Sequence, residues 1–164
     1  MSVVCVKKYG DKIVFAADSI AVINDTKLQM KNLTKLEEVN NMIIGGAGVS
    51  EELNLLFLFS HTHSPLSADE KDIMQFFYEF YKWKVELGLP FASENEYIIG
   101  YDKKAFFVEG LLVKEVLDYH AIGAGMDYAL AALYLGHSPE EAVKVACDLN
   151  CYVAEPIVTK TIEL

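Results

Sequence analysis

Short apolar runs separated by turn residues dominate the first part of the chain. Residues 3–8 and 13–18 are two such runs, and four turn-forming residues lie between them, so the pattern predicts a β-hairpin. The second run is almost entirely apolar, which is typical of a strand that is covered on both faces. Residues 33–39 and 41–48 predict a second hairpin, and the polar segment 19–32 predicts an irregular connection.

Longer segments with helical periodicity predict four helices in two pairs. Ser50 and Ser67 can cap the first two helices. Ser138 begins a capping-box pattern that Glu141 completes three residues later. The predicted helices cover residues 51–63, 68–87, 126–136 and 139–150. The remaining predicted strands cover residues 95–101, 105–109, 116–125 and 151–162.

The order of these elements predicts the fold class. Groups of strands that alternate with pairs of helices favour layered α+β packing over a Rossmann alternation. Four layers, with the helices outside two sheets, would bury both sheets, although periodicity alone does not choose that arrangement. A length of 164 residues is typical of one domain, so we expect residues 1–164 to form a single domain.

Composition and charge exclude some classes of binding partner. The chain is 52% hydrophobic, which is enough for a sizeable core, and its formal net charge is −10. A surface this acidic repels phosphate backbones and anionic membranes, so we expect no nucleic acid and no membrane as partner. No stretch reaches the roughly 18 apolar residues of a spanning helix. No secretory signal is visible, and the three cysteines are too few for a disulfide framework, so we expect a soluble, cytoplasmic protein.

Three polar residues could carry chemistry, and each has a structural alternative. If Met1 is removed, Ser2 gains a free α-amine beside its hydroxyl, a minimal nucleophile and base, although most chains that begin Met-Ser make no such use of the serine. Asp18 ends an apolar strand and must be hydrogen-bonded or paired, as turn aspartates also are. Lys35 alternates with leucines, so it is either a buried lysine with an anionic partner or an exposed edge lysine.

Glycine turns follow two of the predicted strands. Residues 45–48 read GGAG and residues 122–125 read IGAG, and glycines there allow the backbone to approach a ligand closely. The amide of Gly48, just ahead of a helix, could donate to an oxyanion. The alternative for each motif is an ordinary turn between a strand and a helix.

The joint spacing of these features resembles one family over nearly the whole chain. Residues 2–19 resemble the start of mature proteasome β-subunits and of the bacterial HslV-type peptidase. In that family the nucleophile is the first mature residue and an aspartate lies sixteen positions on, as Asp18 does from Ser2. Residues 42–57 resemble the family's glycine turn and first helix, and residues 122–150 resemble its second glycine turn and final helix pair.

The resemblance implies the four-layer αββα sandwich of N-terminal-nucleophile (Ntn) hydrolases and a threonine-type endopeptidase, here with an N-terminal serine. It implies that Ser2, once the initiator methionine is removed, attacks a peptide carbonyl. Lys35 paired with Asp18 supplies positive charge, and the Gly48 amide holds the oxyanion. Asp148 matches the aspartate of the family's final helix and joins the implied catalytic set. No cofactor and no metal is implied.

The resemblance also implies how substrate and partners bind. Ala21 and Val22 would lie along the substrate strand, and Gly46 would line a roomy pocket for the residue before the scissile bond. The chain would form stacked homo-oligomeric rings that take unfolded protein or peptides, with an AAA+ ATPase unfoldase as a possible partner. Two positions depart from the family pattern, because Ala124 and Cys151 stand where the family often has serine.

Two other functions fit the same sequence. A non-catalytic ring subunit would keep the fold and retain Met1, which blocks the α-amine of Ser2. An Ntn amidase would act on small molecules instead of peptides. The pair His61 and His63 suggests a metal site only weakly, because alternate residues rarely suffice without further ligands, and we interpret it as a solvated helix end.

Overall fold

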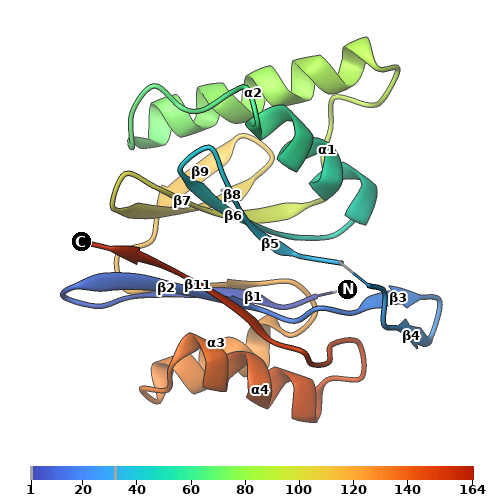
Figure 1. The fold of residues 1–164 in the computed structure, drawn as a ribbon, viewed down its shortest axis with the longest axis vertical. Coiled ribbons are helices and arrows are strands. Elements are labelled where there is room, and N and C mark those ends of the chain that lie inside the picture. The colour runs from blue at the N-terminus through green and yellow to red at the C-terminus, as the bar shows by residue number, and fades with distance from the viewer. Residues whose placement is uncertain (1, 32) are drawn as a thin grey trace.

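Two antiparallel sheets lie face to face between two pairs of helices in the computed structural model, which describes residues 2–31 and 33–164 (Figure 1). One pair of helices covers the outer face of each sheet, so the α+β class predicted from the order of elements is confirmed. The helices are α1 (Ser50–Ser60), α2 (Glu70–Glu86), α3 (Met126–Tyr134) and α4 (Pro139–Leu149). No helix among the described residues is both long and apolar enough to cross a membrane.

The four-stranded sheet combines the two ends of the chain. Its strands run in the order β10-β1-β2-β11, so the first hairpin lies in the centre and two late strands lie on its edges. Within the predicted hairpin, Val4 pairs with Ala17 and Lys8 pairs with Ile13. The bounds are β1 (Val4–Lys8), β2 (Lys12–Ala17), β10 (Tyr119–Ile122) and β11 (Val158–Glu163).

The five-stranded sheet uses a contiguous middle part of the chain. Its strands lie in sequence order, and α1 and α2 are inserted between β6 and β7. Asn40 and Asn41 turn the chain between β5 and β6 with positive φ angles, which asparagine tolerates better than most residues. The bounds are β5 (Leu36–Val39), β6 (Met42–Ala47), β7 (Glu96–Tyr101), β8 (Lys104–Glu109) and β9 (Leu112–Glu115).

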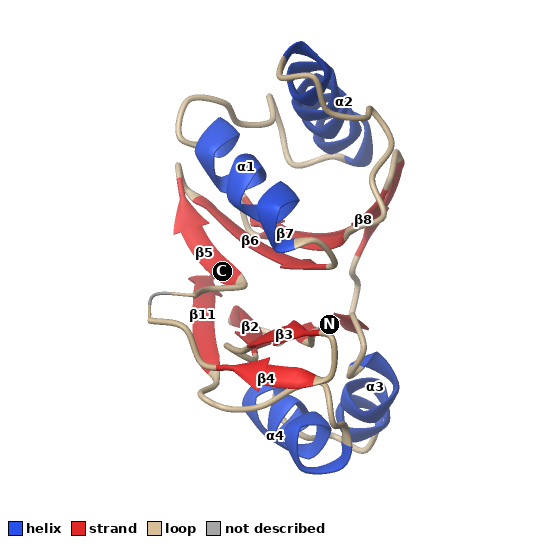
Figure 2. Cartoon of the chain, turned by 90° about the vertical axis from the view of Figure 1, so that its right-hand side faces the viewer, coloured by secondary structure: helices blue, strands red, loops and turns tan. Residues whose placement is uncertain are grey.

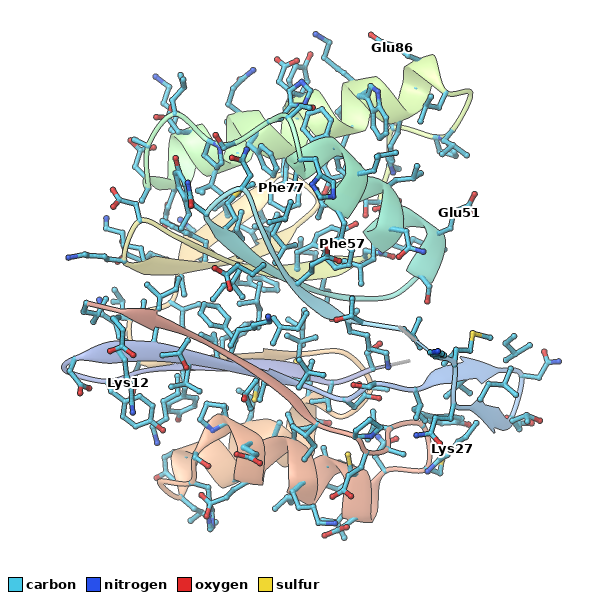
Figure 3. All side chains as sticks on the ribbon, in the orientation of Figure 1. Lys12, Lys27, Glu51, Phe57, Phe77 and Glu86 are labelled. Carbon is cyan, nitrogen blue, oxygen red and sulfur yellow. The ribbon has the colours of Figure 1, made fainter. Side chains whose placement is uncertain are left out.

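Apolar side chains fill all three spaces between these layers. Phe15 and Ile98 belong to the cluster between the two sheets. Phe57 and Phe77 lie in the cluster between the upper helices and the five-stranded sheet, as Figure 3 shows. A third cluster, rich in alanine and valine, packs α3 and α4 against the four-stranded sheet. Both sheets are therefore covered on both faces, which explains the nearly continuous apolar sequence of β2.

The segment after Asp18 is more ordered than its polar sequence indicates. Residues 19–32 were expected to be irregular, but β3 (Ala21–Ile23) and β4 (Thr26–Leu28) pair as a short hairpin. The hairpin lies beyond one end of β1 and β2, so Figure 2, which faces that end, shows it in front of the four-stranded sheet. Asn24, in the turn between the two strands, has a positive φ. Asparagine is favoured at such turn positions, so Asn24 is the local sequence signal for this hairpin.

Two of the three predicted helix caps were wrong. Ser50 is the first residue of α1, and the cap position is Val49, which makes no side-chain cap bond. Helix α2 is capped by Asp69, whose carboxylate accepts from the Asp72 amide, because a carboxylate is favoured at the positive end of a helix. The capping box of Ser138 and Glu141 at α4 is confirmed.

Candidate active site

Ser2 lies two residues before β1 begins at Val4. Its side chain is only 4% exposed. The carbonyl oxygen of Ser2 accepts a hydrogen bond from the Gly125 amide at 3.1 Å. Gly123 has a φ of +89°, and a Cβ there would collide with the same carbonyl oxygen. The IGAG turn therefore holds the backbone of Ser2 in place, and its glycines are needed for this close contact.

A buried ion pair joins the two sheets next to Ser2. The Lys35 Nζ lies 3.0 Å from Asp18 Oδ1 and 2.9 Å from Asp18 Oδ2. The two side chains are 6% and 0% exposed. Asp18 follows β2 of the four-stranded sheet, whereas Lys35 precedes β5 of the five-stranded sheet. The pair therefore depends on the packing of one sheet against the other.

The Asp18 carboxylate also holds the backbone beside Ser2. Asp18 Oδ1 accepts from the Val3 amide at 2.9 Å, and the Asp18 amide donates to the Val3 carbonyl at 3.2 Å. Burial lowers the pKa of Lys35, and the neighbouring Asp18 charge opposes that change. A lysine with a lowered pKa that lines the same cleft as Ser2 can support proton transfer at neutral pH.

Lys35 reaches this position by a route that differs from the predicted one. It was expected to alternate with leucines inside a strand, but β5 begins only at Leu36, and Lys35 lies in the bend before it. Its ammonium group meets Asp18, and its carbonyl oxygen accepts from the Gly46 amide of β6 at 3.0 Å. The anionic partner that a buried lysine needs is nevertheless present.

A narrow cleft opens between Ser2 and the start of α1. Ser2, Lys35, Gly46 and Gly48 all line it. The other lining residues are Leu33, Thr34, Val49, Ser50, Leu53 and Asn54. The structure thus brings four of the predicted site residues to one cleft, although they come from separate parts of the chain.

Gly48 forms the turn between β6 and α1 and requires glycine. Its φ is +133°, and a Cβ there would collide with the side chain of Asn95. Asn95 was not predicted as a site residue. Its Oδ1 accepts from the Val49 amide at 2.7 Å, and its Nδ2 donates to the Val49 carbonyl at 3.0 Å. The sequence offers no local signal for Asn95, since its partner lies 46 residues away.

The lining glycine Gly46 does not leave open space in the cleft. A Cβ at this position would lie 2.6 Å from Leu53 Cδ1 and 3.1 Å from Tyr97 Cδ1. Helix α1 and β7 therefore occupy the space that a side chain would take. The size of the pocket depends on Leu53 more than on the missing side chain of Gly46.

The other predicted site residues lie apart from this cleft. Ala21 and Val22 are half-buried in β3 and do not line it. Asp148 is 58% exposed on α4 and pairs with Lys144 at 3.0 Å. Burial, and then the charge of Asp18, raise the pKa of Cys147, the residue before Asp148, to about 11. Met1 lies outside the described residues, so its removal stays a prediction.

The described part of the chain offers no evident metal centre. Among residues 2–31 and 33–164, no three His, Cys, Asp or Glu side chains are grouped so that they could hold a metal ion. The His63 ring, at the end of α1, stacks on Phe59 with 3.9 Å between ring centroids. This stacking accounts for His63 without a ligand.

Comparisons with known proteins identify the fold. No family model and no curated protein matches the chain. Among solved structures, Thiobacillus denitrificans BPH in complex with Epoxomicin has a TM-score of 0.89 at 19% identity, over 99% of this chain and 98% of that chain. A second structure of Thiobacillus denitrificans BPH has a TM-score of 0.88 at 20% identity, with the same coverage.

Eukaryotic HslV from Trypanosoma brucei is similar over 99% of both chains, with a TM-score of 0.74 and 18% identity. At such identities the likeness shows a shared fold. The predicted resemblance to HslV-type proteins is therefore confirmed at the level of the fold, over the whole chain.

Proposed function

We propose that this chain is a peptidase subunit of a proteasome-like or HslV-like protease, built as a single four-layer αββα domain of the Ntn type over residues 1–164. One observation carries the proposal. The buried Asp18–Lys35 pair lies beside Ser2, in a fold shared with HslV and with an Epoxomicin-binding protein. In this proposal the enzyme is a threonine-type endopeptidase whose nucleophile is the N-terminal serine.

The chemistry follows from the groups around the cleft. Ser2 Oγ attacks a peptide carbonyl and forms a C–O bond, while its proton passes to the α-amine of Ser2 or to Lys35. The Gly48 amide donates to the oxyanion. The C–N bond then breaks, the leaving amine takes the proton, and water hydrolyses the acyl-enzyme. Asp18 orients Lys35 in both steps and stabilises its positive charge whenever it is protonated.

This mechanism depends on the removal of Met1. An N-terminal α-amine titrates near pH 8, so it can accept the hydroxyl proton only when no residue precedes Ser2. Serine lacks the methyl group that restricts the rotamer of threonine, so the hydroxyl is less constrained. Ala124 cannot assist the amine as a serine would, and water takes that role in the proposal.

Substrate and partners follow from the same proposal. An extended peptide would lie along Ala21 and Val22 of β3 and enter the cleft past Gly46. Since Leu53 fills the space beside Gly46, we propose that small to medium side chains fit the pocket best. The subunits would form stacked rings in the cytoplasm and receive unfolded protein, with an AAA+ ATPase as a candidate partner. The proposed mechanism uses no cofactor and no metal.

Covalent labelling tests the proposal directly. The Met1-free protein, verified by intact mass, is treated with an epoxyketone such as epoxomicin, and the modified residue is mapped by mass spectrometry. We expect labelling at Ser2 and its loss in Ser2→Ala and Lys35→Ala. The matched control is Ser67→Ala, which removes an exposed serine at the start of α2 and should leave labelling intact. A Met1-free protein that is folded but unlabelled would contradict the proposal.

The same preparation separates the two alternatives. A native protein that keeps Met1 quantitatively would favour the non-catalytic ring subunit. A protein that is labelled at Ser2 and cleaves simple amides, but not peptides, would favour the small-molecule amidase.

A further inference from the structure

A buried charged group lies in the upper layer of the molecule, away from Ser2. Lys84, near the end of α2, is only 2% exposed and lies 2.6 Å from Glu52 of α1. Its ammonium group lies 5.2 Å from the centroid of the Tyr81 ring and 5.7 Å from that of Phe80, and it donates to the Ala92 carbonyl at 3.4 Å. Burying a charge in such surroundings is costly unless it is fully paired, and a lysine here therefore needs an explanation.

The second oxygen of Glu52 extends the ion pair toward the cleft. Glu52 Oε1 accepts from the Tyr97 hydroxyl at 2.6 Å and from the Ser93 hydroxyl. The Ser93 hydroxyl oxygen in turn accepts from the backbone amide of Asn95 at 3.1 Å. Hydrogen bonds to a charged acceptor are stronger than neutral ones and hold their donors in fixed directions.

Asn95 completes the connection to the turn that lines the cleft. Its side chain bonds both the amide and the carbonyl of Val49, and it packs against Gly48. Gly48 has no side chain to limit its rotation, so its own sequence does not fix the direction of its peptide groups. The two hydrogen bonds between the side-chain amide of Asn95 and the backbone of Val49 supply that restraint.

We propose that Lys84, Glu52, Ser93 and Asn95 are positioning residues that hold the Gly48–Val49 turn in the orientation needed for an oxyanion donor. The proposal rests on the peptidase function proposed above. Helix α2 thereby controls the cleft through α1 and the residues just before β7, without contact with the substrate. A displacement of about 1 Å at such a donor costs roughly 100-fold in rate.

A purely structural role for the same residues predicts a different outcome. An ion pair that only joins α1 to α2 would change the unfolding temperature and leave the kcat of the folded protein unchanged. A role in positioning the turn lowers kcat while KM changes little, since the oxyanion forms only in the transition state.

The test compares four variants with the Met1-free wild type on a fluorogenic peptide. Asn95→Ala removes both bonds to Val49, and we expect kcat to fall about 100-fold with KM within about threefold. Asn95→Asp keeps the acceptor for the Val49 amide, so we expect it to recover part of that loss. We expect Glu52→Gln and Lys84→Met to lower kcat about tenfold, since each acts through Asn95.

Ser60→Ala is the matched control. Ser60 is a buried serine of α1 whose hydroxyl donates to the Leu56 carbonyl, so its loss lowers stability without touching the turn. We expect a lower unfolding temperature and an unchanged kcat. If Asn95→Ala behaves as Ser60→Ala does, the positioning role is refuted while the peptidase proposal stands.

Hydrogen exchange of the Val49 amide gives a readout that needs no activity. This amide is protected by Asn95 in the wild type, and we expect at least tenfold faster exchange in Glu52→Gln. Unchanged protection in Glu52→Gln and Lys84→Met would overturn the network. The two proposals can also fail separately. If Glu52→Gln exchanges the Val49 amide faster, but the wild type neither cleaves peptides nor is labelled at Ser2, the network is supported and the peptidase is refuted.

Discussion

At the scale of residues, both the stability of the fold and the proposed chemistry depend on the ion pair of Asp18 and Lys35. Both side chains are buried, and each lies next to a strand of a different sheet. A buried pair of this kind contributes little compared with an apolar pair of the same shape, but an isolated member of the pair is strongly destabilising. The pair therefore links the stability of the fold to the chemistry of the cleft.

Removing one member of the pair should destabilise the protein more than removing both. Asp18→Ala and Lys35→Met should each lower the free energy of unfolding by about 3–5 kcal/mol, because each leaves an uncompensated buried charge. The double variant should lose much less than the sum, which urea unfolding of all four proteins measures. The exposed pair of Lys114 and Glu70 is the control, and strict additivity at both pairs would contradict the expectation.

Two aspartates were predicted as site residues, and their burial separates them. Asp18→Asn should lower kcat/KM at least 100-fold, since it removes the charge that pairs with Lys35. Asp148→Asn should stay within about threefold of the wild type, because Asp148 pairs with Lys144 at the surface. Peptide hydrolysis by the Met1-free proteins measures both. A large loss in Asp148→Asn would restore the catalytic role that the resemblance implied.

At the scale of elements, the helix caps illustrate what a local signal can decide. The capping box at α4 has both of its reciprocal bonds. Ser138→Ala should lower the free energy of unfolding by about 1 kcal/mol, since one backbone donor of the helix loses its acceptor. Ser50→Ala is the control, because Ser50 makes no cap bond and its loss should change the unfolding midpoint very little. Equal effects in both variants would show that the cap bond contributes nothing measurable.

Elements with a local cause could be predicted from the sequence. The turn at Asn40 and Asn41 and the Ser138 capping box depend on neighbouring residues alone, and both are present. The start of α2 was misplaced because Ser67 and Asp69 compete for the same helix end and the charged side chain wins. Strand β9 was missed because its four residues alternate too briefly to give a periodic signal.

The site could be predicted only for those residues whose spacing in the sequence matches the family pattern. Residue spacing pointed to Ser2, Asp18, Lys35 and Gly48, and these residues do meet, at the ion pair or at the cleft. Asn95 could not be found, because its proposed role depends on a contact between the residue just before β7 and Val49, the residue just before α1. Such contacts are set by the packing of α1 on the sheet, which periodicity does not specify.

For the whole molecule, buried thiol and phenol groups set the response to alkali. Burial raises the pKa of Cys5, Tyr81 and Tyr97, and it raises the pKa of Cys147 to about 11. The native state therefore keeps protons that the unfolded state loses as the pH rises past the ordinary pKa values of these groups. The lowered pKa of Lys35 acts in the opposite direction, but it is a single group.

The stability of the protein should fall steadily as the pH rises above about 9, by up to about 1.4 kcal/mol per pH unit for each such group. Urea unfolding midpoints at several pH values, in the presence of a reductant, measure the fall. Cys5→Ala should make the fall shallower, whereas Cys151→Ala, which removes an exposed thiol, should not. A stability that rises above about pH 9 would show that Lys35 outweighs the other groups.

The order of strands in the four-stranded sheet has a consequence for biosynthesis. The hairpin of β1 and β2 is synthesised before the other strands described above, yet both of its edges are closed by β10 and β11, the latest of these strands in the sequence. Until then both of its edges, and the face that α3 and α4 cover, lack their partners, and the turn that fixes the Ser2 backbone does not exist. A nascent or truncated chain that stops before residue 125 therefore lacks the contact that holds Ser2 at the cleft, so we expect the proposed nucleophile to be inactive in such a chain.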